Sequence, residues 1–326
     1  MTDNIIPYSV LFFILSLTIS LFSLSRIIPK LRGVANQPIY AEGPSWHLGK
    51  SGTPTMGGIA FLLTFFLLSL LSIFMVKAPA ERLSLILLSA FSLLNGAVGI
   101  FDDIMKLKRE ENQGLTARQK LILQAALASV FLLVRQVAFG DGTEISLFGF
   151  TLDLGIFYYP FSIILILGAI NCANLTDGVD GLLSSTAFII SVIMTTISAL
   201  SNSIFVLPAV TLIGITLAFL FHNIHPARVF MGDTGSLFIG ALIISTLYSM
   251  ERPTYFFSLG SVFIIEGVSV ILQVIFFKLR KKRLFLMSPL HHHLERRGIS
   301  ENRICIIAVI TTILLSLPAL IYEVML

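Results

Sequence analysis

Residues 157–201 read FYYPFSIILILGAINCANLTDGVDGLLSSTAFIISVIMTTISALS. Two apolar runs, about 157–173 and 181–201, flank a short polar link that contains two aspartates. A helical run of about 20 apolar residues matches the thickness of the hydrocarbon core of a bilayer. The stretch therefore predicts two membrane-spanning helices joined by an acidic turn at one membrane surface.

The rest of the chain is as apolar as this stretch. Hydrophobic residues make up 56% of its 326 residues, charged residues only 12%, and the mean hydropathy is +0.92. Most of such a chain must be solvated by lipid, so we expect an all-α polytopic membrane protein with residues 1–326 in one integral membrane domain. About ten transmembrane helices are predicted, near residues 8–26, 56–76, 83–101, 120–139, 157–173, 181–201, 203–222, 236–250, 254–277 and 303–322.

The basic residues predict the orientation of these helices. Of the 22 lysine and arginine residues, 18 fall in segments on one side of the predicted membrane. Because cytoplasmic loops carry the excess of positive charge, this side is cytoplasmic and both termini lie outside. The longest outer loop, about 140–156, alternates between polar and apolar residues and predicts a small β-hairpin near 144–154 on the outer surface.

Aspartates end several apolar runs on the same, basic side. A carboxylate at a membrane boundary is costly and usually faces water, a cation or a reacting group, so they predict a cytoplasmic active-site cleft. The adjacent carboxylates of Asp102 and Asp103 repel each other, and a magnesium ion or a lysine would relieve the repulsion. Lys106 and Lys120 could each reach a phosphate. The five aspartates are Asp102, Asp103, Asp177, Asp180 and Asp233.

Two polar segments between apolar runs suggest a ligand pocket. In the link at 171–182, Asn174 and Asp177 share a face at i, i+3, while Asp180 could merely cap the following helix. Glycines beside them allow close backbone approach and favour a nucleoside or metal pocket. In the segment at 222–236, Asp233 could be an N-cap, or it could hold magnesium beside an anion at the helix N-terminus. Phe230 could stack on a base or simply pack.

Three further patterns have both a structural and a functional interpretation. The turn at 52–58 is rich in glycine and proline; Thr55 could cap the next helix, and Lys50 offers a mobile ammonium group. The polar stripe Glu266, Ser269 and Gln273 could face a cavity or form an interhelical hydrogen bond. The consecutive histidines 291–293 point in different directions, so one or two of them could contact phosphate or take a proton.

These motifs resemble the bacterial phospho-N-acetylmuramoyl-pentapeptide-transferases over nearly the whole chain and in the right order. The Asp-Asp pair and Asn-Leu-Thr-Asp are shared with the wider polyprenyl-phosphate N-acetylhexosamine-1-phosphate transferase superfamily. Thr-Pro-Thr-Met-Gly-Gly at 53–58 and Pro-x-His-His-His-x-Glu at 289–295 are typical of the muramoyl-pentapeptide branch. The chain departs from the pattern at Val179, where leucine is common, and at Leu294, where phenylalanine is.

The resemblance implies a reaction, a cofactor and a location. Phospho-N-acetylmuramoyl-pentapeptide would move from its UDP donor to undecaprenyl phosphate, giving lipid I and UMP, with Mg²⁺ in the bacterial cytoplasmic membrane. A homodimer is one assembly it allows, and it implies no nucleic-acid partner. Phosphoryl transfer of this kind needs charge neutralisation and positioning more than covalent chemistry.

The resemblance also implies roles for individual residues. Asp233 would hold the metal, Asp102 would take the acceptor proton or share the metal, and Asp103 would support it. His291 and His292 join them at the reacting phosphates. The uridine pocket would comprise Lys106, Asn174, Asp177, Gly178, Val179, Asp180, Phe230 and Gln273. The phosphates and sugar would meet Lys50, Thr55, Lys120, Asn223, His291 and His292.

Three alternatives remain open at this point. A two-step route, in which an aspartate attacks first, would use the same residues. A sister transferase using UDP-N-acetylglucosamine would share the aspartates but is disfavoured by the triple histidine. A cation-coupled transporter would need its carboxylates near the bilayer midplane and usually an inverted repeat, and no repeat appears.

Overall fold

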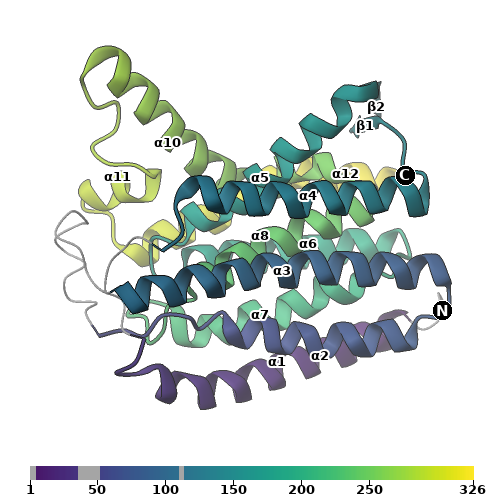
Figure 1. Cartoon of the computed structure of the whole chain (residues 1–326), viewed down its shortest axis with the longest axis horizontal. Coiled ribbons are helices and arrows are strands. Elements are labelled where there is room, and N and C mark those ends of the chain that lie inside the picture. Colours follow the sequence, from purple (N-terminus) through teal and green to yellow (C-terminus); the bar gives the residue numbers. More distant parts are fainter. Residues whose placement is uncertain (1–4, 36–51, 110–113) are drawn as a thin grey trace.

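The computed structural model describes residues 5–35, 52–109 and 114–326, which form a bundle of long helices (Figure 1). Eight helices in the described part are long and apolar enough to cross a membrane, namely α1, α3, α4, α5, α6, α7, α10 and α12. In chain order the elements are α1 (Ile5–Leu31), α2 (Ile59–Met75), α3 (Pro79–Arg109), α4 (Ala117–Phe139), β1 (Glu144–Leu147), β2 (Phe150–Asp153), η3 (Gly155–Phe157), α5 (Tyr158–Thr176), α6 (Leu182–Leu200), α7 (Val206–Asn223), α8 (Gly232–Ser249), η4 (Pro253–Tyr255), α9 (Phe256–Leu259), α10 (Ser261–Arg280), α11 (Leu290–Arg296) and α12 (Glu301–Met325).

Two of the ten predicted spans fall on helices outside this set of eight. One is α2, an apolar helix of 17 residues, and the other is α8, whose residues 234–249 are all buried. The predicted span at 254–277 is wrong as a single helix. It is divided into η4, α9 and α10, and the break falls at Gly260, where α9 ends and α10 begins.

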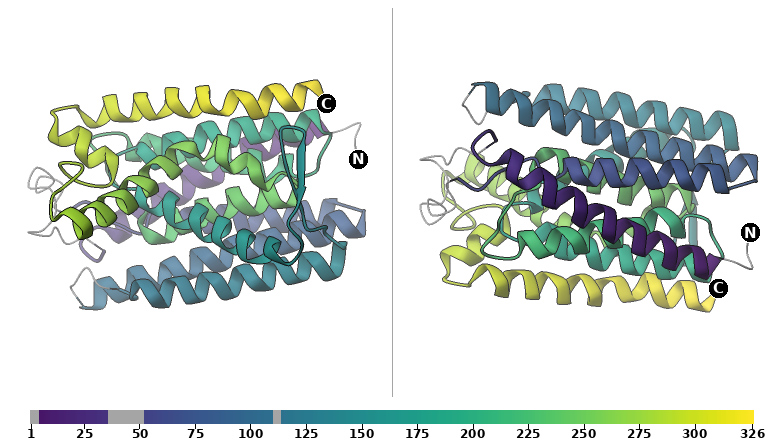
Figure 2. Two further views of the ribbon diagram at one scale, coloured as in Figure 1. Left: turned by 90° about the horizontal axis from the view of Figure 1, so that it is seen from above. Right: turned by 90° about the horizontal axis from the view of Figure 1, so that it is seen from below.

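The buried helix α8 is the centre of the bundle and packs against α3 and α5. A side chain at Gly99 of α3 would lie 2.3 Å from the carbonyl oxygen of Asp233, so the two backbones touch there. Phe65 of α2 packs edge-on against Phe238 of α8, with ring centroids 5.3 Å apart. Around this centre, α12 runs along one edge of the bundle and α3 with α4 along the opposite edge (Figure 2).

The ends of α3 and α4 bring charged residues into one place. The sequence suggested that Asp102 and Asp103 lie at the end of α3. Instead, this helix continues to Arg109, so the two aspartates lie within its last turns. The start of α4 is fixed by a capping box, in which Thr116 Oγ1 accepts from the Gln119 N–H and Gln119 Oε1 accepts from the Thr116 N–H. This box places Lys120 in the first turn of α4.

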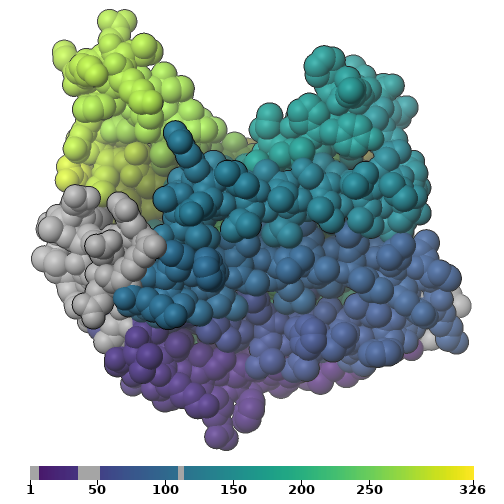
Figure 3. Space-filling view, in the orientation of Figure 1, coloured from purple at the N-terminus to yellow at the C-terminus, as the bar shows by residue number. Residues whose placement is uncertain are grey.

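The predicted hairpin is confirmed as an antiparallel pair, with Glu144 opposite Asp153 and Leu147 opposite Phe150. It and α10 project from the same side of the bundle at opposite ends, and the surface between them is hollowed (Figures 1 and 3). The beginning of α1 and the end of α12 lie at the hairpin end, whereas α11 lies at the other.

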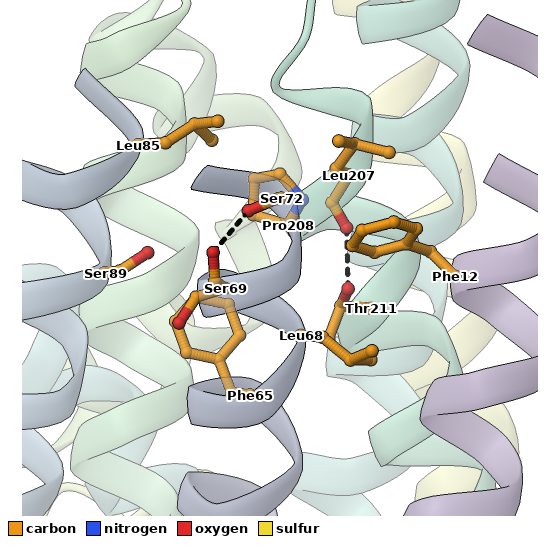
Figure 4. Close-up of a pocket in the computed structure, with 10 residues that line it drawn as sticks. All are labelled: Phe12, Phe65, Leu68, Ser69, Ser72, Leu85, Ser89, Leu207, Pro208 and Thr211. Carbon is orange, nitrogen blue, oxygen red and sulfur yellow. Dashed lines mark hydrogen bonds between the residues drawn. The ribbon is translucent and has the colours of Figure 1, made fainter. Parts of the chain in front are cut away.

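A small, partly open pocket lies between α1, α2, α3 and α7 (Figure 4). Phe12, Leu85 and Pro208 contribute apolar walls, while Ser69 and Ser72 contribute hydroxyl groups. The two serine hydroxyls already donate to helix carbonyl groups of α2. None of the predicted site residues in the described part of the chain lines this pocket, so it is separate from the predicted site.

Candidate active site

Three carboxylates and two lysines meet where α3, α4 and α8 come together. Lys106 Nζ lies 2.7 Å from Asp102 Oδ2, 3.2 Å from Asp233 Oδ1 and 3.8 Å from Asp103 Oδ1. Lys120 Nζ lies 2.6 Å from Asp233 Oδ2 and 3.1 Å from Asp102 Oδ2. The two ammonium groups thus bridge Asp102 and Asp233 from α3 and from α4. Residues far apart in the sequence form one charged cluster, which we call the aspartate cluster.

Asp103 differs from the other two aspartates because both of its carboxylate oxygens accept from the start of α8. Its Oδ1 accepts from the Asp233 N–H at 3.1 Å, and its Oδ2 accepts from the Thr234 N–H at 2.9 Å and the Thr234 hydroxyl at 2.7 Å. The prediction that Asp233 could be an N-cap is therefore wrong. The N-cap residue of α8 is Met231, and Asp103 supplies the capping oxygens from another helix.

The aspartate cluster suits a divalent cation by its charge and its donor atoms. Asp102, Asp103 and Asp233 each offer an oxygen within 4.8 Å of the others, and carboxylate oxygens are the ligands that Mg²⁺ prefers. Three carboxylates exceed two ammonium groups by one negative charge. Both oxygens of Asp103 are engaged at the start of α8, whereas Asp102 and Asp233 each direct carboxylate oxygens at the two lysines. Asp102 is fully buried and held by the Leu115 N–H at 2.7 Å from Oδ1.

The link between α5 and α6 lies beside the aspartate cluster. Asn174 Nδ2 donates to Asp233 Oδ1 at 3.1 Å and to Ser236 Oγ at 2.8 Å, so the amide holds the second carboxylate oxygen of Asp233. Asp177 follows α5 directly. Desolvation, and next the carboxylates of Asp233 and Asp103, raise the pKa of Asp177 to about 8. The neutral form of this carboxyl group is therefore favoured compared with an ordinary aspartate.

Asp180 joins three segments on the same end of the bundle. Its Oδ2 lies 3.0 Å from His225 Nδ1 and accepts from the Ala227 N–H at 3.0 Å, while its own N–H donates to Glu301 Oε2 at 2.9 Å. The suggestion that it caps α6 is wrong, because the N-cap of α6 is Gly181 without a side-chain bond. Asn223, only 2% exposed, binds the Gly181 N–H and Val229 carbonyl group and so steadies the same loops.

The histidine segment forms the short helix α11 and places its first histidine inside the protein. His291 is fully buried. Its backbone N–H donates to Glu266 Oε2 at 3.2 Å, and its ring Nδ1 lies 3.2 Å from the same oxygen. On the other side, a side chain at Gly178 would lie 2.2 Å from His291 Nε2. The imidazole is thus held between the carboxylate of Glu266 and the backbone of the α5–α6 link.

Two other predicted residues, His292 and Gln273, form hydrogen bonds within α11 and to the segment that follows α10. His292 Nδ1 lies 2.6 Å from Glu295 Oε2. Gln273 Oε1 accepts from the Leu284 N–H at 3.0 Å and the Phe285 N–H at 2.9 Å, so Gln273 pins the segment after α10. Val179 is 4% exposed and packs in a small apolar cluster with residues of α6, α10 and α12.

The glycine-rich turn at 52–58 packs against the segment that precedes α8. The Phe230 N–H donates to the Pro54 carbonyl oxygen, and the Gly57 N–H donates to the Phe230 carbonyl oxygen. Thr55 is 8% exposed, yet it does not cap α2 as expected, because the N-cap of α2 is Gly58. Lys50 lies outside the described residues. A side chain at Gly58 would lie 2.3 Å from the Gly235 nitrogen, which explains the glycine.

Comparison with known proteins identifies the family. Residues 85–251 match the model of glycosyl transferase family 4, and residues 50–62 match the phospho-N-acetylmuramoyl-pentapeptide-transferase signature 1. A phospho-N-acetylmuramoyl-pentapeptide-transferase of Caldicellulosiruptor bescii is 40% identical over 96% of both chains. The chain belongs to this transferase family. Proteins of the same name are 40% identical in Halalkalibacterium halodurans, over 90% of both chains, and 43% identical in Petrotoga mobilis, over 87% of this chain and 88% of that one.

The signature of the phospho-N-acetylmuramoyl-pentapeptide-transferases thus has a structural reason in this chain. Its described part forms the backbone pairing with Phe230 and Met231, directly before the helix that bears Asp233. Membership and the eight apolar helices together establish a multi-pass membrane protein.

Several residues at the site were missed or undervalued by sequence reasoning. Ser236 and Gln124 were not singled out, although each is a polar residue one turn beyond a charged one, Asp233 and Lys120 respectively. His225 and Glu301 gave no signal, because they meet Asp180 only through the folding of three separate segments. Glu266 was noted only as part of a polar stripe, and its partner could not be named.

Proposed function

We propose that this protein transfers phospho-N-acetylmuramoyl-pentapeptide from UDP-N-acetylmuramoyl-pentapeptide to undecaprenyl phosphate, releasing UMP and forming lipid I. A phosphate oxygen of the lipid acceptor attacks the phosphorus that carries the sugar, and the bond from that phosphorus to UMP breaks. The proposal rests above all on the aspartate cluster, in which Lys106 and Lys120 bridge Asp102 and Asp233 in a chain of this family. Such chemistry depends on charge neutralisation and in-line positioning.

Asp233 and Asp102 are the residues that would hold Mg²⁺. When bound, the ion would neutralise negative charge on the donor pyrophosphate, which is broken, and on the lipid-linked pyrophosphate, which is formed. Asp102 would alternatively take the proton of the acceptor phosphate. Asp103 supports both by fixing the first turn of α8. The ammonium groups of Lys106 and Lys120 are already directed at the same carboxylates and would turn toward phosphate oxygens when the donor binds.

The donor nucleoside is assigned to the α5–α6 link and the segments around it. Asn174, Asp177 and Gly178 line this link next to the aspartate cluster. The remaining residues of the proposed uridine pocket are Lys106, Val179, Asp180, Phe230 and Gln273. The proposed contacts to the phosphates and sugar are Lys50, Thr55, Lys120, Asn223, His291 and His292, with Asn223 acting through the loop that it steadies.

We infer that the site faces the cytoplasm in a bacterial inner membrane. The excess of lysine and arginine on this side of the sequence supports that orientation, which places both termini and the hairpin outside. We also propose that the protein has about ten membrane spans in one domain over residues 1–326. This number counts α2 and α8 with the eight helices that are long and apolar enough to cross a membrane. A homodimer is compatible with it. Donor and lipid acceptor would then meet at the membrane surface.

The deciding experiment measures UMP release by the full chain in lipid nanodiscs with undecaprenyl phosphate and Mg²⁺. UDP-N-acetylmuramoyl-pentapeptide should be turned over and UDP-N-acetylglucosamine should not. Turnover of UDP-N-acetylglucosamine instead would identify the sister transferase activity. If neither donor reacts, the transferase proposal fails, and ion flux in proteoliposomes would test the transporter alternative.

A further inference from the structure

An amide pair lies one helical turn deeper in the bundle than the aspartate cluster. Asn171 Nδ2 of α5 donates to Gln124 Oε1 of α4 at 2.7 Å. Gln124 is fully buried, and both helices are long and apolar enough to cross a membrane. Polar side chains in such helices face the bundle interior and are costly to keep there, so each calls for an explanation.

Each member of the pair stands one turn from a residue that holds Asp233. Gln124 follows Lys120 by four residues, and Asn171 precedes Asn174 by three, so each lies on the same helix face as its neighbour. Lys120 binds Asp233 Oδ2 at 2.6 Å and Asn174 binds Oδ1 at 3.1 Å. The spacing of α4 and α5 therefore decides whether both oxygens of Asp233 are held at once.

The pair is poorly explained by stability alone. Gln124 Nε2 is buried and has no hydrogen-bond partner in the described part of the chain. A buried donor without a partner costs about 1–3 kcal/mol, whereas an apolar residue of similar shape avoids this cost. A hydrogen bond has a narrow range of distance and angle, so it restricts the register of α4 against α5 more tightly than contact between two apolar side chains at this position would.

We propose that Gln124 is a positioning residue for the transfer reaction. Its hydrogen bond to Asn171 fixes α4 against α5, so that Lys120 and Asn174 hold the two oxygens of Asp233 from opposite sides. The inference rests on the proposed function, because its effect is read in the rate of that reaction.

The test compares variants of the full chain in nanodiscs by UMP release and thermal unfolding. Gln124→Leu should fold with a Tm close to that of the wild type and lose about tenfold or more in kcat, since small misplacements of catalytic groups can cost up to about 100-fold. KM for the UDP donor should change little, and the Mg²⁺ concentration for half-maximal rate should shift. The double variant Gln124→Asn with Asn171→Gln exchanges the two side chains. It should recover most of the kcat that Gln124→Leu loses.

The matched control is Gln136→Leu on the same helix. Tyr159 of α5 donates to Gln136 Oε1 at 3.1 Å, so this change also breaks an α4–α5 hydrogen bond, but at the opposite end of α4. It should leave kcat unchanged. Equal loss of kcat in the two variants, or full kcat in Gln124→Leu, would overturn the proposal. An inactive wild type would instead refute the proposed function.

Discussion

Asp103 and Thr234 are joined by two hydrogen bonds that end on one carboxylate oxygen. Oδ2 of Asp103 accepts from both the N–H and the hydroxyl of Thr234, at 2.9 and 2.7 Å. Through this contact α3 holds the first turn of α8, the helix that bears Asp233. The adjacent aspartates therefore divide their work, since Asp102 faces the lysines and Asp103 fixes the backbone beside them.

We expect Asp103→Asn to lower stability and activity together. The amide nitrogen of asparagine would face the α8 N–H groups and leave at least one of them without an acceptor. The loss of a helix cap costs about 1 kcal/mol, and more when buried donors are left unpaired. The Tm and the rate of UMP release should both fall. Thr234→Ala, which keeps the backbone donors, should lower both by a smaller amount. An inactive Asp103→Asn with wild-type Tm would mean that Asp103 acts on substrate directly.

Asp233→Asn should separate chemistry from folding. It removes the carboxylate that both lysines and Asn174 contact, so UMP release should be abolished at every Mg²⁺ concentration. Chelation of the metal should abolish it in the wild type as well, and added Mg²⁺ should restore it there only. Binding of UDP-sugar by calorimetry would be retained in part because the proposed uridine contacts remain. Wild-type turnover by Asp233→Asn would refute the metal assignment.

The sequence predicted the helices well because apolar runs of membrane length have few other solutions. The five aspartates were expected on one face, and the structure brings Asp102, Asp103 and Asp233 together, whereas Asp180 lies in a separate group with His225 and Glu301. The prediction failed where a role depends on contacts between distant segments. Nothing local to Asp103 indicates a cap for a helix that begins 129 residues later. The sequence allowed Thr55 to cap α2, but that helix begins only after Gly57, which packs against the segment before α8, and Gly58, which packs against α8 itself.

The break at Gly260 was missed for a different reason. Apolar periodicity continues through it, so residues 254–277 look like one span, although α9 ends at Leu259 and a new helix follows. Only packing decides this, because a side chain at Gly260 would lie 2.4 Å from the ring of Phe256. The same limit applies to Glu266, whose histidine partner arrives from a segment 25 residues further on.

Gly178→Ala should impair the reaction by displacing His291. The new methyl group would lie 2.2 Å from His291 Nε2, and the imidazole is fully buried between Gly178 and Glu266. We expect a loss of about tenfold or more in kcat/KM, as small displacements at a reacting site are costly. Gly168→Ala in α5 is the control, because open space surrounds that position. It should be neutral or slightly stabilising. Full activity of Gly178→Ala would exclude a role for the histidine position.

Asp177 predicts a pH dependence of stability. Its pKa rises from the ordinary 3.8 to about 8, first through desolvation and then through neighbouring carboxylates. Between these values the folded protein keeps a proton that the unfolded chain has lost, so rising pH favours unfolding. The contribution is fully present below about pH 4 and is lost by about pH 8. Asp177→Asn cannot titrate, so the wild type should lose Tm relative to this variant as pH rises.

The measurement is the difference in Tm between the wild type and Asp177→Asn from pH 5 to pH 9, without metal or nucleotide. Other titrating groups cancel in this difference, which should grow up to about pH 8 and then level off. Asp153→Asn is the control, because hydrogen bonds from the Thr143 hydroxyl and the Gly155 N–H lower the pKa of exposed Asp153. Its difference from the wild type should therefore be flat above pH 5. A flat difference for Asp177→Asn as well would mean that Asp177 is already ionised at pH 5, which contradicts its raised pKa.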